Sequence, residues 1–334
     1  MAAQTVLVTG ASGYIAAHVV DAFLKKGYNV RGTVRSEKTA EGVRKSHSKY
    51  AEQLSIAIVP DMAAANAFDE AVKGVDGVIH TASPFIFNAT DFEKELMQPA
   101  IRGTTSILEA VQKYNPSVSR VVVTSSFAAV LDPLQGQRPG YTYTEADWNP
   151  ITVEKANTDP VLAYLASKVF AERAVFNYVE ANKPNFTVTT MCPPLVYGPI
   201  IHSVSDIKSL NTSSADINRL FDGSEKDVPD TAFHAFVDVR DLGEAHVLAY
   251  EKPEAAGQRY LVSSSAYSYQ QICDIIREKF PELKELTPKG NTGTPLPPAY
   301  RLDNTKTVTE LGLTLRPLEE SIVDMVNSLL KLRE

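Results

Sequence analysis

A doubly wound α/β fold is the architecture that this sequence predicts. Short apolar runs, each suited to a buried strand, alternate with segments of helical periodicity, which is typical of a parallel sheet covered on both faces. The first run leads directly into a glycine-rich turn and a helix. Beyond about residue 192 this alternation gives way to loops and short helical patterns. We therefore expect a Rossmann-type sheet with a smaller, discontinuous C-terminal substrate lobe.

The predicted strands follow from the apolar runs, taken in chain order. They span residues 5–9, 29–34, 54–59, 77–81, 120–124 and 187–191. Helical patterns fill the intervals, the longest over residues 92–114. Because ligands of such sheets bind at the carboxyl ends of the strands, the small and polar residues after each strand should line one crevice. His80 lies within the fourth strand, so we expect a packed core residue there rather than a catalyst.

The turn after the first strand has the form of a dinucleotide-binding fingerprint. Gly10 permits the tight turn, Gly13 lets the backbone approach a pyrophosphate, and the small Ala16 allows close packing of helix on strand. The helix N-terminus then offers free N–H groups and a positive dipole to the phosphates. The candidate cofactor-binding residues of this turn are Gly10, Ala11, Ser12, Gly13, Tyr14 and Ile15.

The end of the second strand indicates which dinucleotide fits. Sites that prefer NAD usually carry an acidic residue there, whereas this chain has Arg35. A guanidinium binds a 2′-phosphate through charge-assisted hydrogen bonds, and a carboxylate would repel it. Arg35, assisted by Lys38, therefore predicts NADP(H). The alternative is that Arg35 is an ordinary solvated side chain.

Tyr164 and Lys168 lie on a helix predicted over residues 161–181, which Asp159 and Pro160 introduce. Their spacing places the phenol and the ammonium side by side on one helix face. A nearby cation favours the phenolate, so we expect a lowered tyrosine pKa and a phenol able to protonate a developing alkoxide. Taken alone, such a pair is more often ordinary helix surface.

Ser125 and Ser126 end the fifth strand at the rim where ligands are expected. Ser126 is placed to hold a substrate carbonyl oxygen beside the tyrosine hydroxyl. A serine pair also ends strands and caps turns for purely local reasons, and on its own that explanation is preferred.

Changes of pattern along the chain predict two discontinuous domains. Residues 1–192 and 237–264 would form the NADP-binding Rossmann domain, and residues 193–236 and 265–334 the substrate-binding lobe. Within the lobe, Ser268 and Gln271 form a capping-box pattern that opens a helix to about Phe280. An amphipathic helix over 318–332 closes the chain.

Composition and charge argue against several classes of function. The 334 residues are 44% hydrophobic and 22% charged, with a net charge of −7 and no basic block, so nucleic acid and anionic membranes are not expected partners. No apolar run approaches membrane-spanning length. The two cysteines, Cys192 and Cys273, lack metal-ligand spacing. We expect a cytoplasmic protein without a metal, and the oligomeric state stays open.

A series of motifs resembles the extended short-chain dehydrogenase/reductase family over nearly the whole chain. The likeness is strongest to fungal NADPH-dependent carbonyl reductases of the methylglyoxal/isovaleraldehyde reductase type. It is more distant to plant dihydroflavonol and cinnamoyl-CoA reductases. The motifs are Val8–Ile15, His80–Phe85, Val123–Ala129, Tyr164–Lys168, Val196–Pro199, Leu210–Ser213 and Val237–Asp241.

The resemblance implies reduction of a small aldehyde or ketone to an alcohol with NADPH. Ser126 would polarise the carbonyl oxygen, Tyr164 would protonate it, and Lys168 would hold the nicotinamide ribose. The further cofactor contacts that it implies are Asp61, Met62, Ala82, Ser83, Pro193, Val196 and Ser213. An asparagine-tryptophan-tyrosine-cysteine run found in cinnamoyl-CoA reductases is absent, which counts against a phenylpropanoid thioester substrate.

The substrate pocket and the reaction leave alternatives open. Phe85, Phe127 and Tyr197 fall beside the cofactor segments and are candidates for an apolar substrate pocket, with core packing equally compatible. A sugar-nucleotide epimerase or dehydratase would use the same scaffold, although no basic residue within 193–236 is well placed for a sugar diphosphate. A non-enzymatic dinucleotide sensor would not need the tyrosine–lysine pair.

Overall fold

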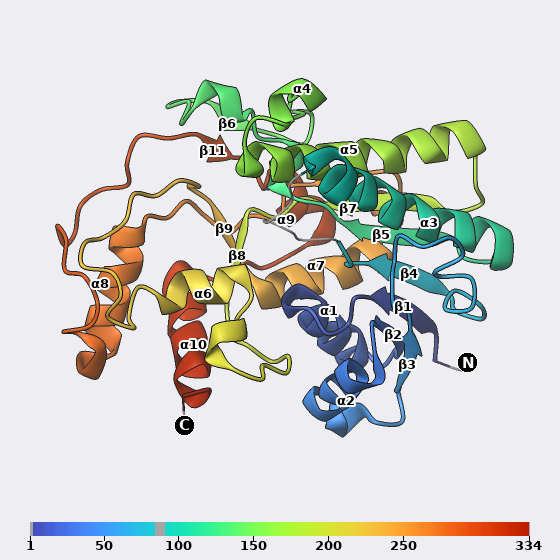
Figure 1. Ribbon diagram of the computed structural model, residues 1–334, viewed down its shortest axis with the longest axis horizontal. Coiled ribbons are helices and arrows are strands. Elements are labelled where there is room, and N and C mark those ends of the chain that lie inside the picture. The colour runs from blue at the N-terminus through green and yellow to red at the C-terminus, as the bar shows by residue number, and fades with distance from the viewer. Residues whose placement is uncertain (1–2, 84–90, 334) are drawn as a thin grey trace.

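The computed structural model describes residues 3–83 and 91–333 (Figure 1). Within these ranges the main sheet has seven strands in the order β3-β2-β1-β4-β5-β7-β10, and all neighbouring strands are parallel. The strands are β1 (Thr5–Thr9), β2 (Asn29–Val34), β3 (Leu54–Ile58), β4 (Gly77–His80), β5 (Arg120–Thr124), β7 (Thr187–Met191) and β10 (Arg259–Tyr260). The predicted Rossmann-type sheet is confirmed, and β3 and β4 each end one residue earlier than expected.

Helices cover both faces of the sheet, as Figure 1 shows. On one face α1 (Tyr14–Lys25) packs against α7 (Val239–Glu251), and on the other α3 (Gln98–Tyr114) packs against α5 (Pro160–Asn182). Successive side chains of β1 point to opposite faces, so Val6 and Val8 belong to the core beneath α1 and Leu7 to the core beneath α3. Both cores exclude water, which makes the sheet a rigid support for the residues at its carboxyl edge.

Local signals in the sequence explain where α5 begins. Its N-cap, Asp159, accepts hydrogen bonds from the backbone N–H groups of Val161 (2.8 Å) and Leu162 (3.0 Å), and Pro160 occupies the first turn. A short π-helical turn, Glu93–Met97, leads into α3. The helix predicted over 92–114 is therefore present with an altered first turn.

The C-terminal part of the chain builds a hydrophobic core of its own. It joins α6 (Thr212–Asn218), α8 (Tyr269–Lys279) and α10 (Leu318–Lys331) with the parallel pair β8 (Leu195–Tyr197) and β9 (Phe236–Asp238). The capping box of Ser268 and Gln271 is present at the start of α8. Helix α6 was not predicted, because its stretch of the sequence is polar and lacks a helical period.

The segment between α8 and α10 crosses back toward the sheet. Strand β11 (Arg301–Leu302) pairs with β6 (Thr142–Tyr143), and α9 (Thr305–Leu311) carries Leu311 into the core beneath α1. The separate C-terminal core supports the predicted lobe, but its boundaries stay a prediction. Of the helices in the described ranges, including α2 (Glu37–Ser46) and α4 (Val153–Ala156), none combines the length and apolarity needed to cross a membrane.

Candidate active site

The glycine-rich turn brings the backbone of β1 close to the end of β4. Gly10 has a φ of 68°, in the left-handed region that favours glycine, and a Cβ there would lie 3.1 Å from the Cα atom of Ala82. The Gly13 N–H donates to the Gly10 carbonyl at 2.9 Å, and α1 starts at the next residue. The first N–H groups of a helix have no partner within it. The turn therefore presents bare backbone and a positive helix end to the same space.

This space is a cavity of about 430 Å³ at the carboxyl ends of the strands near the topological switch between β1 and β4. Seven of the predicted cofactor residues meet here, although they come from distant parts of the sequence: Gly10, Ser12, Gly13, Arg35, Met62, Ala82 and Ser83. The lining residues are Gly10, Ser12, Gly13, Thr33, Val34, Arg35, Thr39, Val59, Met62, Phe68, Thr81, Ala82 and Ser83.

Arg35 lies on the rim of this cavity and is exposed. No ion-pair partner of Arg35 occurs among the residues that the structure describes. The nearest acidic residue in the sequence, Glu37, instead pairs with Arg44 further along α2. The guanidinium is thus available to an anion at the cavity mouth.

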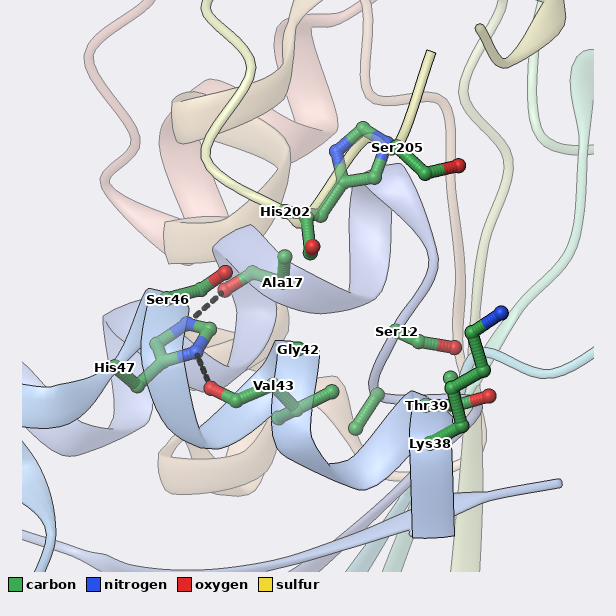
Figure 2. Close-up of a pocket in the computed structure, with 12 residues that line it drawn as sticks. Ser12, Ala17, Lys38, Thr39, Gly42, Val43, Ser46, His47, His202 and Ser205 are labelled. Carbon is green, nitrogen blue, oxygen red and sulfur yellow. Dashed lines mark hydrogen bonds between the residues drawn. The ribbon is translucent and has the colours of Figure 1, made fainter. Parts of the chain in front are cut away.

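Lys38 lines a second cavity of about 370 Å³, which shares Ser12 and Thr39 with the first (Figure 2). At the opposite end from Lys38, the His47 ring contacts the carbonyl oxygens of Ala17 and Val43, both at 3.1 Å. These contacts tie α1 to α2 and hold Lys38 near the glycine turn. Lys38 and Arg35 therefore line two cavities that have Ser12 and Thr39 in common.

The other predicted cofactor residues are placed less directly. Asp61 is exposed, and its carboxylate accepts from the Ala63 N–H at 2.9 Å. Val196 is 5% exposed and packs in the core beneath α1. Three more are buried or half-buried: Tyr14 and Ile15 in the first turn of α1, and Ser213 in the first turn of α6. The Pro193 carbonyl accepts from the Phe127 N–H at 2.8 Å.

Ser126 and Tyr164 line one further cavity, of about 110 Å³. Ser126 follows β5, where its Oγ accepts from the Ala128 N–H at 3.1 Å, and Tyr164 projects from the second turn of α5. Both side chains face this cavity, and hydrogen bonding by Ser126 acts to lower the pKa of Tyr164. The remaining walls are mainly apolar: Phe127, Ala128, Leu165, Pro194, Leu195, Phe233, Ala235 and Tyr300. Two hydroxyl groups able to hold an oxygen atom thus line a mainly apolar pocket.

Lys168 lies one helical turn beyond Tyr164. Its Nζ is 5.4 Å from the centroid of the tyrosine ring and donates to Ser83 Oγ at 2.6 Å. Burial lowers the pKa of Lys168 to about 8. The lysine lies between the cavity of about 430 Å³, which Ser83 lines, and the pocket of about 110 Å³, which Tyr164 lines.

The expected lowering of the tyrosine pKa is wrong for this structure. Burial raises the pKa of Tyr164 to about 12, although the hydrogen bond with Ser126 acts in the opposite direction. Spacing on a helix predicted proximity to a cation, but removal of the phenol from water has the larger effect. Tyr164 is consequently protonated at neutral pH, which still suits a proton donor to an alkoxide.

Of the three predicted substrate residues, the structure places one in the pocket. Phe127 lines it and is 3% exposed. Tyr197 instead lies fully buried in the C-terminal core, where its hydroxyl is hydrogen-bonded to Asp216 (2.8 Å) and Tyr267 (3.0 Å). Of the two alternatives for Tyr197, the structure therefore supports core packing. Phe85 lies outside the described residues.

Sequence reasoning missed Leu195, Phe233 and Tyr300, which all line the pocket. Phe233 and Tyr300 sit in polar or proline-rich loops whose pattern carries no structural period. Only the tertiary fold brings them together, and no local signal marks them. His80 is a buried core residue, as expected: its Nδ1 lies 2.9 Å from Thr9 Oγ1, and burial followed by the charge of Lys168 lowers its pKa to about 4.

Comparison with known proteins places this architecture in a family. The profile of the NAD dependent epimerase/dehydratase family matches residues 6–263. The chain belongs to this family. It is 40% identical over 331 residues to a protein of Candida albicans named as a putative NADPH-dependent methylglyoxal reductase, covering 96% of this chain and 97% of that one. It is 38% identical over 335 residues to a cinnamoyl-CoA reductase of Medicago truncatula, covering 98% and 95%.

A solved structure is similar over the same extent. The yeast methylglyoxal/isovaleraldehyde reductase Gre2, complexed with NADPH, superposes with a TM-score of 0.92 at 38% identity, covering 99% of each chain. The resemblance seen in the sequence motifs is therefore confirmed at the level of family and fold.

Proposed function

We propose that this chain is an NADPH-dependent reductase that converts a small aldehyde or ketone to an alcohol. The observation that carries the proposal is the mainly apolar pocket that Ser126 and Tyr164 line together, with Lys168 one helical turn beyond Tyr164. Its volume of about 110 Å³ suits a small carbonyl compound. The names of the similar proteins, which are NADPH-dependent reductases, support the same reaction.

The cavity of about 430 Å³ at the glycine-rich turn fits NADPH. Gly10 and Gly13 let the pyrophosphate approach the backbone, and the N-terminus of α1 complements its charge. Arg35 and Lys38 would hold the 2′-phosphate, and Lys168 the nicotinamide ribose. We also propose the fuller set predicted from sequence, with Asp61 and Met62 near the adenine, and Pro193, Val196 and Ser213 near the nicotinamide. When bound, the cofactor supplies the hydride.

The residues of the chain supply orientation and a proton. Ser126 holds the carbonyl oxygen next to Tyr164, which is protonated at neutral pH, and burial raises its pKa further above that range. Tyr164 Oη donates its proton as negative charge develops on that oxygen. Apolar walls such as Phe127 and Phe233 exclude water, which strengthens both interactions.

An epimerase or dehydratase acting on a sugar nucleotide is the main alternative within this family. Such a substrate carries a diphosphate, which needs cationic side chains. Among the described residues that line the pocket, none carries a positive charge. The pocket therefore favours a small uncharged carbonyl compound over a sugar nucleotide, and the filled catalytic positions argue against a sensor without enzymatic activity.

To test this function, the purified protein is assayed with a panel of aldehydes, diketones, β-keto esters and aryl ketones. The loss of NADPH absorbance in the near ultraviolet measures the reaction. At least one should be reduced with net consumption of NADPH. Tyr164→Phe should lower kcat by roughly 10²-fold or more, the usual scale for a positioned general acid. Near-normal turnover of that variant would disprove the role of Tyr164. An epimerase would consume no NADPH, because it regenerates its cofactor in each turnover.

A further inference from the structure

Glu172 is a buried carboxylate that the proposed reaction does not use. It lies on α5, one turn beyond Lys168 and two turns beyond Tyr164, and its side chain is 0% exposed. Its oxygens accept hydrogen bonds from Ser125 Oγ (2.8 Å) and Thr190 Oγ1 (2.6 Å). A buried charge is costly unless it is paired, so the arrangement needs a counter-ion.

Arg259 is that counter-ion. Its Nε and Nη2 atoms reach the two oxygens of Glu172 at 2.8 and 3.2 Å, a bidentate geometry. Its Nη1 donates to the carbonyl oxygens of Glu145 (2.6 Å) and Asp147 (2.9 Å), and its guanidinium lies 3.6 Å from the centroid of the Trp148 ring. The bidentate ion pair with Arg259 therefore holds the carboxylate in one position.

The partners of Glu172 come from three neighbouring strands. Arg259 belongs to β10, Thr190 to β7, and Ser125 directly follows β5. The helix that carries Tyr164 is thereby joined to the strand end that carries Ser126. The Ser125 N–H also donates to the Met191 carbonyl at 2.7 Å, so both the backbone and the side chain of Ser125 are held.

We propose that Glu172 is a positioning residue that, through Ser125, sets the placement of Ser126 against Tyr164. This role rests on the proposed function, because it concerns the two groups that would hold the carbonyl oxygen. The distance between their oxygens depends on how α5 sits on the end of β5, and the Ser125–Glu172 hydrogen bond is a direct link between those elements. A displacement of about 1 Å at such a site costs up to about 10²-fold in rate.

Ser125→Ala tests the link without disturbing the ion pair. Arg259 still compensates Glu172, so the variant should fold and bind NADPH with an unchanged Kd, measured by cofactor fluorescence. At saturating NADPH and carbonyl substrate, kcat should fall about tenfold. Ser125→Thr, which keeps a hydroxyl, should recover most of that loss.

Thr190→Val is the matched control. It removes the other hydroxyl bonded to the same carboxylate, from a strand that carries no proposed catalytic side chain, so stability should fall as in Ser125→Ala while kcat stays within about twofold. The proposal is overturned if Ser125→Ala keeps the wild-type kcat, if Thr190→Val loses as much, or if Ser125→Ala acts through the Kd of NADPH. A wild-type protein that reduces no carbonyl compound would overturn the proposed function itself, and this role with it.

Discussion

At the scale of single residues, burial governs the two ionisable groups at the centre of the site. Burial favours the neutral form of both side chains: it raises the pKa of Tyr164 to about 12 and lowers the pKa of Lys168 to about 8. A protonated phenol is the form that donates a proton. A lysine with a pKa near 8 is still mostly charged at neutral pH, but it loses its charge within the range of ordinary assays.

We therefore predict that NADPH affinity falls as pH rises through about 8. The neutral amine is a poorer donor to the ribose and no longer attracts the anionic cofactor. Protein stability should respond in the opposite sense. Since the folded pKa is depressed below the ordinary lysine value of about 10.4, the charged lysine destabilises the fold below about pH 8, and this cost diminishes as the pH rises from about 8 to about 10.4.

The measurement is the Kd of NADPH across that interval for wild type and Lys168→Met. The variant should bind more weakly at neutral pH and show a flatter dependence on pH. Equal slopes for both proteins would assign the pH dependence to another group.

At the scale of elements, the junction of β2 and α2 is the end of the cavity where we propose that an anion binds. Ser36 caps α2 by accepting from the Thr39 N–H at 3.3 Å, so the positive end of this helix lies beside Arg35. Helix dipole and guanidinium thus act on the same place, where sequence analysis predicted a 2′-phosphate.

Arg35→Ala should weaken NADPH binding by about 1–2 kcal/mol, or about 5- to 30-fold in kcat/KM, after allowance for exposure of the site to water. Activity with NADH should hardly change, because that cofactor lacks the phosphate. Lys45→Ala, on the last turn of α2, removes the same charge away from the cavity and serves as control. Equal losses with both cofactors would mean that Arg35 supports the adenine or the fold.

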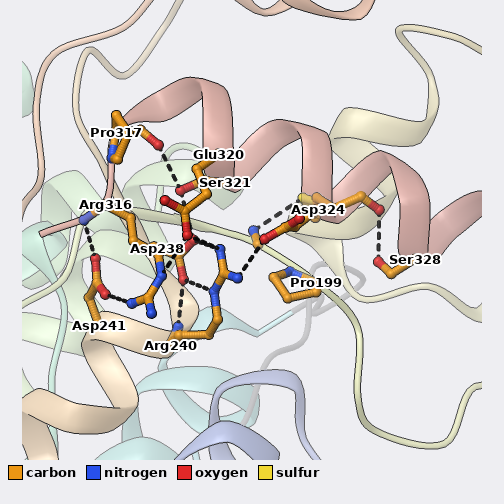
Figure 3. Close-up of polar contacts among 12 residues, drawn as sticks. Pro199, Asp238, Arg240, Asp241, Arg316, Pro317, Glu320, Ser321, Asp324 and Ser328 are labelled. Carbon is orange, nitrogen blue, oxygen red and sulfur yellow. Dashed lines mark hydrogen bonds and ion pairs between the residues drawn. The ribbon is translucent and has the colours of Figure 1, made fainter. Parts of the chain in front are cut away.

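At the scale of the whole molecule, an ion-pair cluster joins α10 to the start of α7 (Figure 3). Arg240 binds both oxygens of Asp238, at 2.9 and 2.8 Å, and reaches Asp324 on α10 at 2.5 Å. Ser321 donates to Asp238 at 2.7 Å. Burial alone would raise the pKa of Asp238, but these hydrogen bonds hold it below its usual value. The cluster fastens the last helix of the C-terminal core to the Rossmann part.

Arg240→Met should destabilise the protein strongly, by about 3–5 kcal/mol, because it leaves the fully buried carboxylate of Asp238 without its counter-ion. Denaturant unfolding measures this change. Lys279→Met is the control, since it breaks an exposed pair with Glu319 on the same helix α10 and should hardly move the midpoint. Equal shifts for the two variants would show that burial of Asp238 does not matter.

The sequence by itself determined those features of the protein that depend on a few consecutive residues. The alternation of apolar runs predicted the sheet, Gly10 and Gly13 the turn, and Asp159 the start of α5. Such features depend on backbone conformation and side-chain period, which act over a few residues. The spacing of Tyr164 and Lys168 belongs to the same class, since one helix places both.

Only the tertiary structure decided what surrounds these residues. Tyr197 proved to be a core residue and Tyr300 a pocket wall, because segments far apart in the chain enclose Tyr197 in the C-terminal core and place Tyr300 beside Phe127 in the pocket lining. The pair of Glu172 and Arg259 is separated by 87 positions, and no pattern near either residue reveals it. The pKa of Tyr164 depends on the loss of surrounding water more than on its helical neighbour. Burial is a property of the assembled fold, and a local pattern does not contain it.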